Sequence, residues 1–237
     1  MWVAVILAVT FIVGAAVQGL VGLGLGLVAA PIVTLLEPQM MPGLLLWLAF
    51  LMPLVTLVRD HHQIDWRGLV WAIPGRVPGT AVGVAFVGWF TAREIGIAVG
   101  LMVLASVVLT LRSVRLSVNP GTLLAGGFVS GITGTTTSIG GPPMAILYQH
   151  RSVAQIRSTL AVYFLLGTGL SLAGLGVTGS LDRATFFLAT VMVPCLLLGF
   201  LASRVLRRVV PAEHIRGGVL LVCGLSAVVL LVKSLVS

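Results

Sequence analysis

Apolar residues fill the chain in long stretches, and charged residues are confined to the short connections between them. A helix that crosses the roughly 30 Å hydrocarbon core of a bilayer needs about 20 predominantly apolar residues. Stretches of that order recur along all 237 residues. The pattern predicts an all-α, polytopic helical membrane protein.

Two of the apolar stretches are interrupted by clusters of glycine, and three ordinary stretches follow each of them. In the first half we expect a broken segment and then three spans, over 2–36, 43–58, 68–89 and 94–111. In the second half we expect the same order, over 122–148, 159–177, 184–203 and 215–233. The chain therefore divides into two membrane repeats, 1–118 and 119–237, within a single integral membrane domain.

The two halves also match in sequence. Residues 17–22, VQGLVG, match residues 129–134, VSGITG, at an offset of 112 residues, and the same offset places Pro31 on Pro143. Further along, Pro78 matches Pro194. Each match is weak alone, but their common order along the chain predicts an internal repeat.

Composition supports the membrane interpretation and changes how the charge is understood. Of the residues, 58% are apolar and 8% are charged, and the mean hydropathy is +1.16. In a membrane protein an excess of basic residues marks the cytoplasmic side of the bilayer. The formal charge of +8 is therefore no sign of a nucleic-acid partner.

The basic residues distinguish a hairpin from a single crossing in each broken segment. If each segment is a hairpin and the linker 112–120 is cytoplasmic, ten basic residues lie inside: Arg59, Arg67, Arg112, Arg115, Arg151, Arg157, Arg204, Arg207, Arg208 and Arg216. Three then lie outside: Arg93, Arg183 and Lys233. A single crossing would instead leave six inside and seven outside, which is no bias.

A hairpin followed by three spans crosses the membrane an odd number of times, so the two halves must face opposite ways. The sequence thus predicts two inverted-topology repeats, an arrangement that recurs in secondary transporters. We expect a multi-pass membrane protein with both termini on the side opposite the cytoplasm.

The glycine clusters would lie at the tips of two hairpins that enter from opposite faces. Irregular backbone at membrane depth is tolerated only where protein or a water-filled cavity surrounds it, so we expect the tips to meet near the midplane and line a site. Glycine leaves amide N–H groups uncovered, and helices that start after Pro31 and Pro143 would direct their amino ends into the cavity. Donors without carboxylates favour an anion.

The expected substrate-binding residues come from these tips and from one intramembrane arginine: Gln18, Gly19, Gly22, Gly24, Arg76, Ser130, Gly131, Gly134, Thr135, Thr136, Thr137, Ser138, Gly140, Gly141 and Pro142. The alternative is that small residues only let helices pack closely, and this is our interpretation of Gly100, Gly167 and Gly174.

Arg76 lies about nine residues into its span, roughly 12 Å deep at 1.5 Å per residue. A charge at that depth is a functional hypothesis by default, although an arginine can also extend its head group to the membrane surface. Arg157, just before the next span, is a weaker candidate of the same kind.

Other chemistry lacks residues to carry it out. The acidic residues fall in loops or at span ends, so no buried carboxylate relay is visible: Glu37, Asp60, Asp65, Glu94, Asp182 and Glu213. The histidines also lie in connections: His61, His62, His150 and His214. Cys195 and Cys223 are interpreted as packing residues. We expect no enzyme activity, no metal and no cofactor.

Two motifs resemble those of the TauE/SafE family of sulfite and organosulfonate exporters: VGAAVQGLVGLGLG at 13–26 and, more specifically, GGFVSGITGTTTSIGGPP at 126–143. The resemblance spans essentially the whole chain. It implies transport of small sulfur-containing anions such as sulfite, thiosulfate, sulfoacetate or related sulfonates across the bacterial inner membrane, which would place both termini in the periplasm. The chain departs from the family pattern at Thr135–Thr137, which replace a more glycine-rich turn.

The sequence therefore predicts a secondary transporter that exports such anions by alternating access, with the substrate held between the two tips and the halves rocking about it. Alternatives are an anion-selective channel, a permease for another small organic anion, and a structural subunit without a ligand. The expected partners are the small anionic substrate and the lipid bilayer, with no nucleic acid and with a homodimer as a possible assembly.

Overall fold

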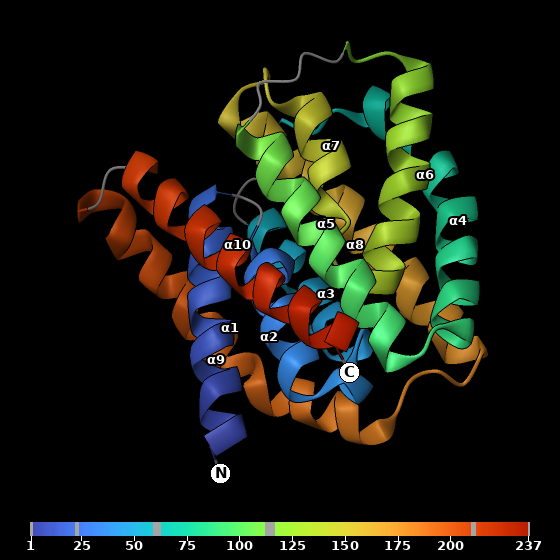
Figure 1. The fold of residues 1–237 in the computed structure, drawn as a ribbon. Helices are drawn as coiled ribbons and strands as arrows, with labels where there is room; N and C mark the ends of the chain where they lie inside the picture. The colour runs from blue at the N-terminus through green and yellow to red at the C-terminus, as the bar shows by residue number, and fades with distance from the viewer. Residues whose placement is uncertain (1, 22–23, 59–62, 112–116, 210–211, 237) are drawn as a thin grey trace.

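The computed structural model describes residues 2–21, 24–58, 63–111, 117–209 and 212–236. These residues form α-helices and one short 3-10 helix, with no strand among them (Figure 1). The predicted all-α class is therefore confirmed. In chain order the elements are α1 (Trp2–Val21), α2 (Leu25–Leu36), η1 (Pro38–Met40), α3 (Gly43–Leu57), α4 (Trp66–Trp89), α5 (Ala92–Leu111), α6 (Pro120–Thr137), α7 (Gly141–Tyr148), α8 (Val153–Val177), α9 (Arg183–Val209) and α10 (Ala212–Val236).

Six helices of the described chain are long and apolar enough to cross a membrane: α1, α4, α5, α8, α9 and α10. The helix α3, which we expected to be a full span, has 15 residues and is shorter. At 1.5 Å per residue it is about 22 Å long, less than the roughly 30 Å hydrocarbon core. Trp2, Trp66 and Trp89 stand at helix ends with their side chains largely exposed, as expected of interfacial aromatic residues.

Each glycine-broken segment is a helical hairpin, as the charge distribution predicted. The helix α2 packs along α1, and α7 packs along α6. Figure 1 shows α1 entering from the end of the molecule where the N-terminus lies, while α6 enters from the opposite end. Opposite entry of the hairpins is what an inverted repeat requires, and inversion of the complete halves in the membrane stays a prediction.

The expected helix starts were wrong in both hairpins. The helix α2 begins at Leu25, six residues before Pro31, and α7 begins at Gly141, two residues before Pro143. Proline inside a helix removes one backbone hydrogen bond, but neighbouring helices make this tolerable in membrane proteins. Proline is accordingly found within α2, α3, α4 and α9, and it does not mark where these helices begin.

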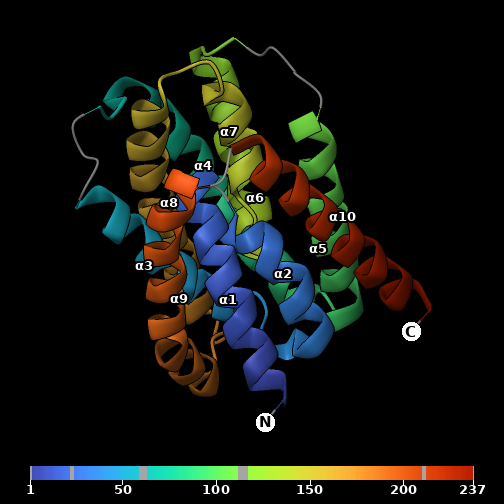
Figure 2. The same ribbon diagram turned by 90° about the vertical axis from the view of Figure 1, so that its left-hand side faces the viewer.

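The closest helix pairs join the two halves of the chain. The helix α4 packs most extensively on α6, and α1 packs most extensively on α9. Figure 2 shows α9, α1 and α2 side by side on one face. The helices α4 and α9 have the same position in the helix order of their halves, and so do α1 and α6. The α4–α6 pair and the α1–α9 pair are therefore equivalent contacts between the two halves.

Glycines allow the backbones of α4 and α6 to touch. A methyl group added at Gly75 or Gly79 would overlap the carbonyl groups of Leu124 and Phe128 on α6. From the other side, one added at Gly131 would lie 2.6 Å from the Arg76 carbonyl oxygen. Small residues in such a seam let membrane helices approach closely, so the middle of α4 is fixed against α6.

Candidate functional site

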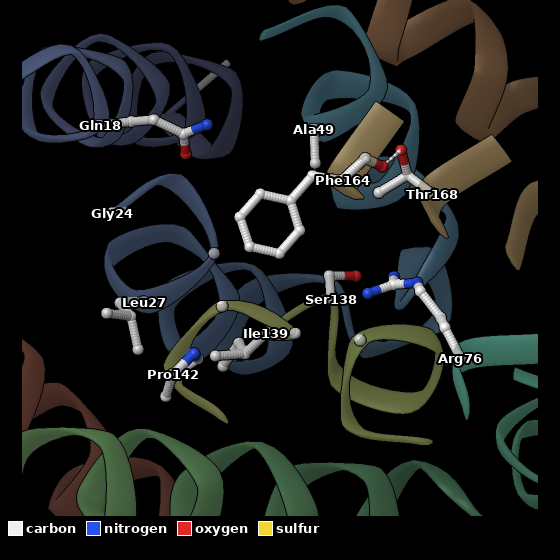
Figure 3. Close-up of a pocket in the computed structure, with 14 residues that line it drawn as sticks. Gln18, Gly24, Leu27, Ala49, Arg76, Ser138, Ile139, Pro142, Phe164 and Thr168 are labelled. Carbon is white, nitrogen blue, oxygen red and sulfur yellow. Dashed lines mark hydrogen bonds between the residues drawn. The ribbon is translucent and has the colours of Figure 1, made fainter. Parts of the chain in front are cut away.

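A cavity of about 60 Å³ lies between the breaks of the two hairpins (Figure 3). Residues from both hairpins line it, together with residues from α3, α4 and α8: Gln18, Gly24, Gly26, Leu27, Ala49, Arg76, Gly134, Ser138, Ile139, Gly140, Gly141, Pro142, Phe164 and Thr168. Arg76 is near the middle of α4, which runs from Trp66 to Trp89, so the cavity is at mid-depth of that helix.

The two hairpin breaks contact each other directly. A Cβ atom added at Gly26, in the first turn of α2, would lie 2.6 Å from the backbone oxygen of Ser138. Ser138 has a φ of 61°, in the left-handed region, and its backbone ends α6 at this point. The absence of a side chain at Gly26 therefore lets the tips meet, as the sequence predicted.

Equivalent polar residues close the two breaks. In the first hairpin Gln18 Oε1 accepts a hydrogen bond of 3.0 Å from the backbone N–H of Leu25. In the second, the hydroxyl of Ser130 donates to the carbonyl oxygen of Gly140. Gln18 and Ser130 correspond in the sequence repeat, and each connects the first arm of its hairpin to the residues that follow the break.

Arg76 supplies a buried cation to the cavity. Its side chain is 1% exposed, and its Nη1 donates to the Ser130 hydroxyl at 2.9 Å. Its Cζ lies 4.9 Å from the centre of the Tyr163 ring, in a cation–π arrangement. Figure 3 shows the guanidinium extending toward Ser138 at the edge of the cavity.

The charge of Arg76 is not compensated by the part of the protein that the structure describes. Its Nε has no hydrogen-bond partner there, and no described carboxylate lies within ion-pair distance. A buried charge without a counter-ion is strongly unfavourable, so an anion in the cavity would stabilise the positive charge of Arg76. The side chain does not extend to the surface, which was the other interpretation of this residue.

Eight of the residues predicted for the site line the cavity: Gln18, Gly24, Arg76, Gly134, Ser138, Gly140, Gly141 and Pro142. Ser130 is behind this lining, where it holds both Arg76 and Gly140. Gly131 serves the contact between α4 and α6, and Gly19 packs against Ser203 of α9. Gly22 lies outside the described residues.

The three threonines of the second motif belong to the last turn of α6 and do not line the cavity. The Thr135 hydroxyl is 2.8 Å from the Ser171 hydroxyl of α8. Thr136 and Thr137 donate to the carbonyls of Ile132 and Thr133, one turn back in their own helix. All three hydroxyls are therefore engaged by the protein itself.

Sequence reasoning missed several residues of the site. Leu27, Ala49, Ile139 and Phe164 carry no polar group that could have distinguished them from ordinary core residues. The Phe164 ring extends from α8 between Gln18 and Ser138 (Figure 3). Thr168 also lines the cavity, and its hydroxyl donates to the Phe164 carbonyl oxygen at 2.6 Å.

A larger and mainly apolar cavity of about 280 Å³ adjoins the first one and shares Leu27 and Pro142 with it. It is also lined by Thr110, Gln149 and Ile156, which are close to the helix ends next to the 112–120 linker. The two cavities together extend from the hairpin tips toward the linker end of the molecule.

The described acidic residues all lie at helix ends, away from the cavity. Asp65 caps α4 by accepting a hydrogen bond from Gly68 N–H, and it also accepts one from the Tyr148 hydroxyl at 3.0 Å. No cluster of metal ligands occurs among the residues whose placement is described. Asp60 and the side chain of Glu213 lie outside them.

Comparisons with known proteins cover nearly the whole chain. The family model described as "Sulfite exporter TauE/SafE" matches residues 6–230. The chain is 29% identical over 163 residues to the "Probable inner membrane transporter protein TsaS" of Comamonas testosteroni, an alignment that covers 66% of this chain and 68% of that protein. No solved structure matches significantly.

Proposed function

Because the chain belongs to the sulfite exporter TauE/SafE family, we propose that it is a secondary transporter that exports small sulfur-containing anions across the bacterial inner membrane. Sulfite, thiosulfate and sulfoacetate are the expected class of substrate. The substrate is held between the two hairpin breaks, and alternating access moves it across the membrane. The similarity to a probable inner membrane transporter supports the location.

The observation that carries this proposal is Arg76. It is a buried cation without a carboxylate partner among the described residues, and it lines a cavity formed by the glycine-rich breaks. Guanidinium groups bind oxyanions through paired N–H donors. A sulfite or sulfonate oxygen in this cavity would accept from the guanidinium and compensate its charge.

The size of the cavity supports a compact head group. Its volume is about 60 Å³, which suits a compact anion such as sulfite or thiosulfate. A larger organosulfonate would place only its sulfonate group there.

The energetics favour export without a coupled ion. A membrane potential negative inside drives an anion outward by about 2.3 kcal/mol per charge per 100 mV. The adjoining apolar cavity would give the substrate access from the linker end, which we expect to be cytoplasmic. Uniport is accordingly the simplest form of the proposed mechanism.

Flux in proteoliposomes tests the proposal and separates it from a channel. We expect saturable efflux of sulfite or thiosulfate and stimulation by unlabelled anion on the opposite side, because a carrier exchanges its substrate. Flux that does not saturate would indicate an anion channel, and no flux of any sulfur-containing anion would overturn the proposal.

The matched variants are Arg76→Gln and Arg67→Gln. Arg76→Gln removes the buried charge of the site and should abolish saturable binding. Arg67 is exposed at the start of α4, so the same substitution there should leave flux at the wild-type level.

A further inference from the structure

Arg157 of α8 holds the carboxyl end of α1 at the break of the first hairpin. Its Nη2 donates to the backbone oxygens of Gly19, at 3.1 Å, and of Leu20, at 3.0 Å. These carbonyls belong to the last turn of α1, directly after Gln18, which lines the cavity. The guanidinium is therefore next to the anion site without being part of its lining.

The carboxyl end of a helix is a negative pole, equivalent to about half an elementary charge, because its last carbonyls have no partner in the helix. A helix broken inside a membrane places this pole at the substrate site. In cation-coupled transporters such carbonyls coordinate the coupling ion, while the amino end of the next half-helix faces the anionic part of the substrate. In this chain the guanidinium of Arg157 donates to two carbonyls of this kind.

The second hairpin shows a related arrangement with Arg76. A Cβ atom added at Gly134, in the last turn of α6, would lie 3.0 Å from Arg76 Nη2. Arg76 comes from the first half of the chain and Arg157 from the second. Each hairpin thus has an arginine of the opposite half at the carboxyl end of its first arm.

We propose that Arg157 is a resident counter-cation for the first hairpin break: a positioning residue that neutralises the carboxyl end of α1, makes the site selective for anions and takes the place of a coupling cation. The inference rests on the proposed function, because it assigns the charge selectivity of the same site. It follows that transport requires neither Na⁺ nor K⁺ at this break.

The test compares a dianion with a monoanion of similar size, thiosulfate and methanesulfonate, in Arg157→Ala and Arg157→Lys proteins in proteoliposomes. Removing the positive charge of Arg157 from a partly buried helix end should weaken the binding of a monoanion by about two- to fivefold. Because the Coulomb energy is proportional to charge, the dianion should lose about the square of that factor. Arg157→Lys should retain most of the affinity for both anions.

Millimolar guanidinium added to Arg157→Ala should restore thiosulfate affinity, while the wild-type protein should not respond. Equal loss of affinity for both anions, or absence of rescue in a variant whose melting temperature is normal, would show that Arg157 is only structural and would overturn the inference. If Arg157→Ala does not fold, Arg157→Gln takes its place, and equal KM changes for the two anions in that variant, or Na⁺-dependent wild-type flux, would overturn the inference. A wild-type protein that carries no sulfur-containing anion would instead refute the proposed function and with it this inference.

Discussion

Gly167 of α8 leaves the space that the guanidinium of Arg76 occupies. A methyl group added at Gly167 would overlap Arg76 Nε and Cζ. From the sequence we interpreted Gly167 as one of several glycines that only allow helices to pack. Gly100 and Gly174 do pack against neighbouring side chains, those of Leu231 and Val84, whereas Gly167 determines where the cation of the site can lie.

Gly167→Ala should therefore act on the substrate site through Arg76. Overpacking a close contact costs about 1–3 kcal/mol, and 1.4 kcal/mol corresponds to about a tenfold change in affinity. We expect the KM for sulfite to rise about tenfold or more. Gly88→Ala is the matched control, because a Cβ at Gly88 meets nothing within 4 Å.

A double-mutant cycle shows whether the effect passes through the guanidinium. In an Arg76→Ala background the overlapping Cδ, Nε and Cζ atoms are absent, so Gly167→Ala should lower the melting temperature clearly less than it does in the wild type. Additive losses in melting temperature would mean that Gly167 affects the site by another route.

Ser130→Ala should weaken both the site and the fold. It removes the acceptor of Arg76 Nη1 and the donor to the Gly140 carbonyl, both buried. Leaving such groups unpaired costs about 1–3 kcal/mol. We expect a lower melting temperature together with a raised KM for sulfite.

The control for this variant is Ser106→Ala. Ser106 is equally buried, but its hydroxyl donates only to a carbonyl of its own helix. A Ser130→Ala protein that differs from it in neither melting temperature nor KM would contradict the role assigned to Ser130.

The threonines that end α6 should have unequal effects when replaced by valine. Thr135→Val removes the hydrogen bond to Ser171 between α6 and α8 and should cost about 1 kcal/mol of stability. Thr136→Val removes only a bond within α6 and should stay within about 0.5 kcal/mol of the wild type. Neither hydroxyl lines the cavity, so the KM for sulfite should change less than in Ser130→Ala, which flux measurements with thermal unfolding would check.

The orientation of the chain can be tested with single cysteines. Ser117, in the linker, and Ser180, between α8 and α9, are both exposed. In a protein without Cys195 and Cys223, a membrane-impermeant maleimide added to spheroplasts should label Ser180→Cys and should reach Ser117→Cys only after lysis. The opposite pattern would reverse the predicted topology and the assigned side of the larger cavity.

The hairpins could be predicted because three independent signals coincide at them. Glycine clusters break otherwise continuous apolar stretches, the sequence repeat aligns Gln18 with Ser130, and the distribution of arginines excludes a single crossing. Each of these signals can be read from short stretches of sequence or from a sum of charges, so none of them requires knowledge of how the helices pack. The structure accordingly has α1 and α2 within the expected 2–36, whereas α6 begins at Pro120, two residues before the expected 122–148.

The site was only partly predictable from the sequence. A polar residue in a motif does not show whether its hydrogen bonds are already made within the protein. The Thr135 hydroxyl is hydrogen-bonded to Ser171 of another helix, Thr136 donates within α6, and Thr137 donates within α6 and accepts from Ile139 N–H. Conversely, Gly167 and Phe164 have no polar side chain, and only the packing of α8 brings them to the site. Pro31 misled the prediction of a helix start because α2 continues through it, and proline is tolerated inside membrane helices that pack against others.

The glycine contacts that join α4 to α6 also limit which parts of the protein can move as rigid bodies. Arg76 belongs to the first half in sequence, yet its backbone is fixed to the first arm of the second hairpin. The pairing of α1 with α9 joins the halves in the same way. A rocking motion that keeps both contacts would therefore move α4 together with α6, and α1 together with α9. Each moving body would then contain helices from both halves and would differ from either predicted repeat of the sequence.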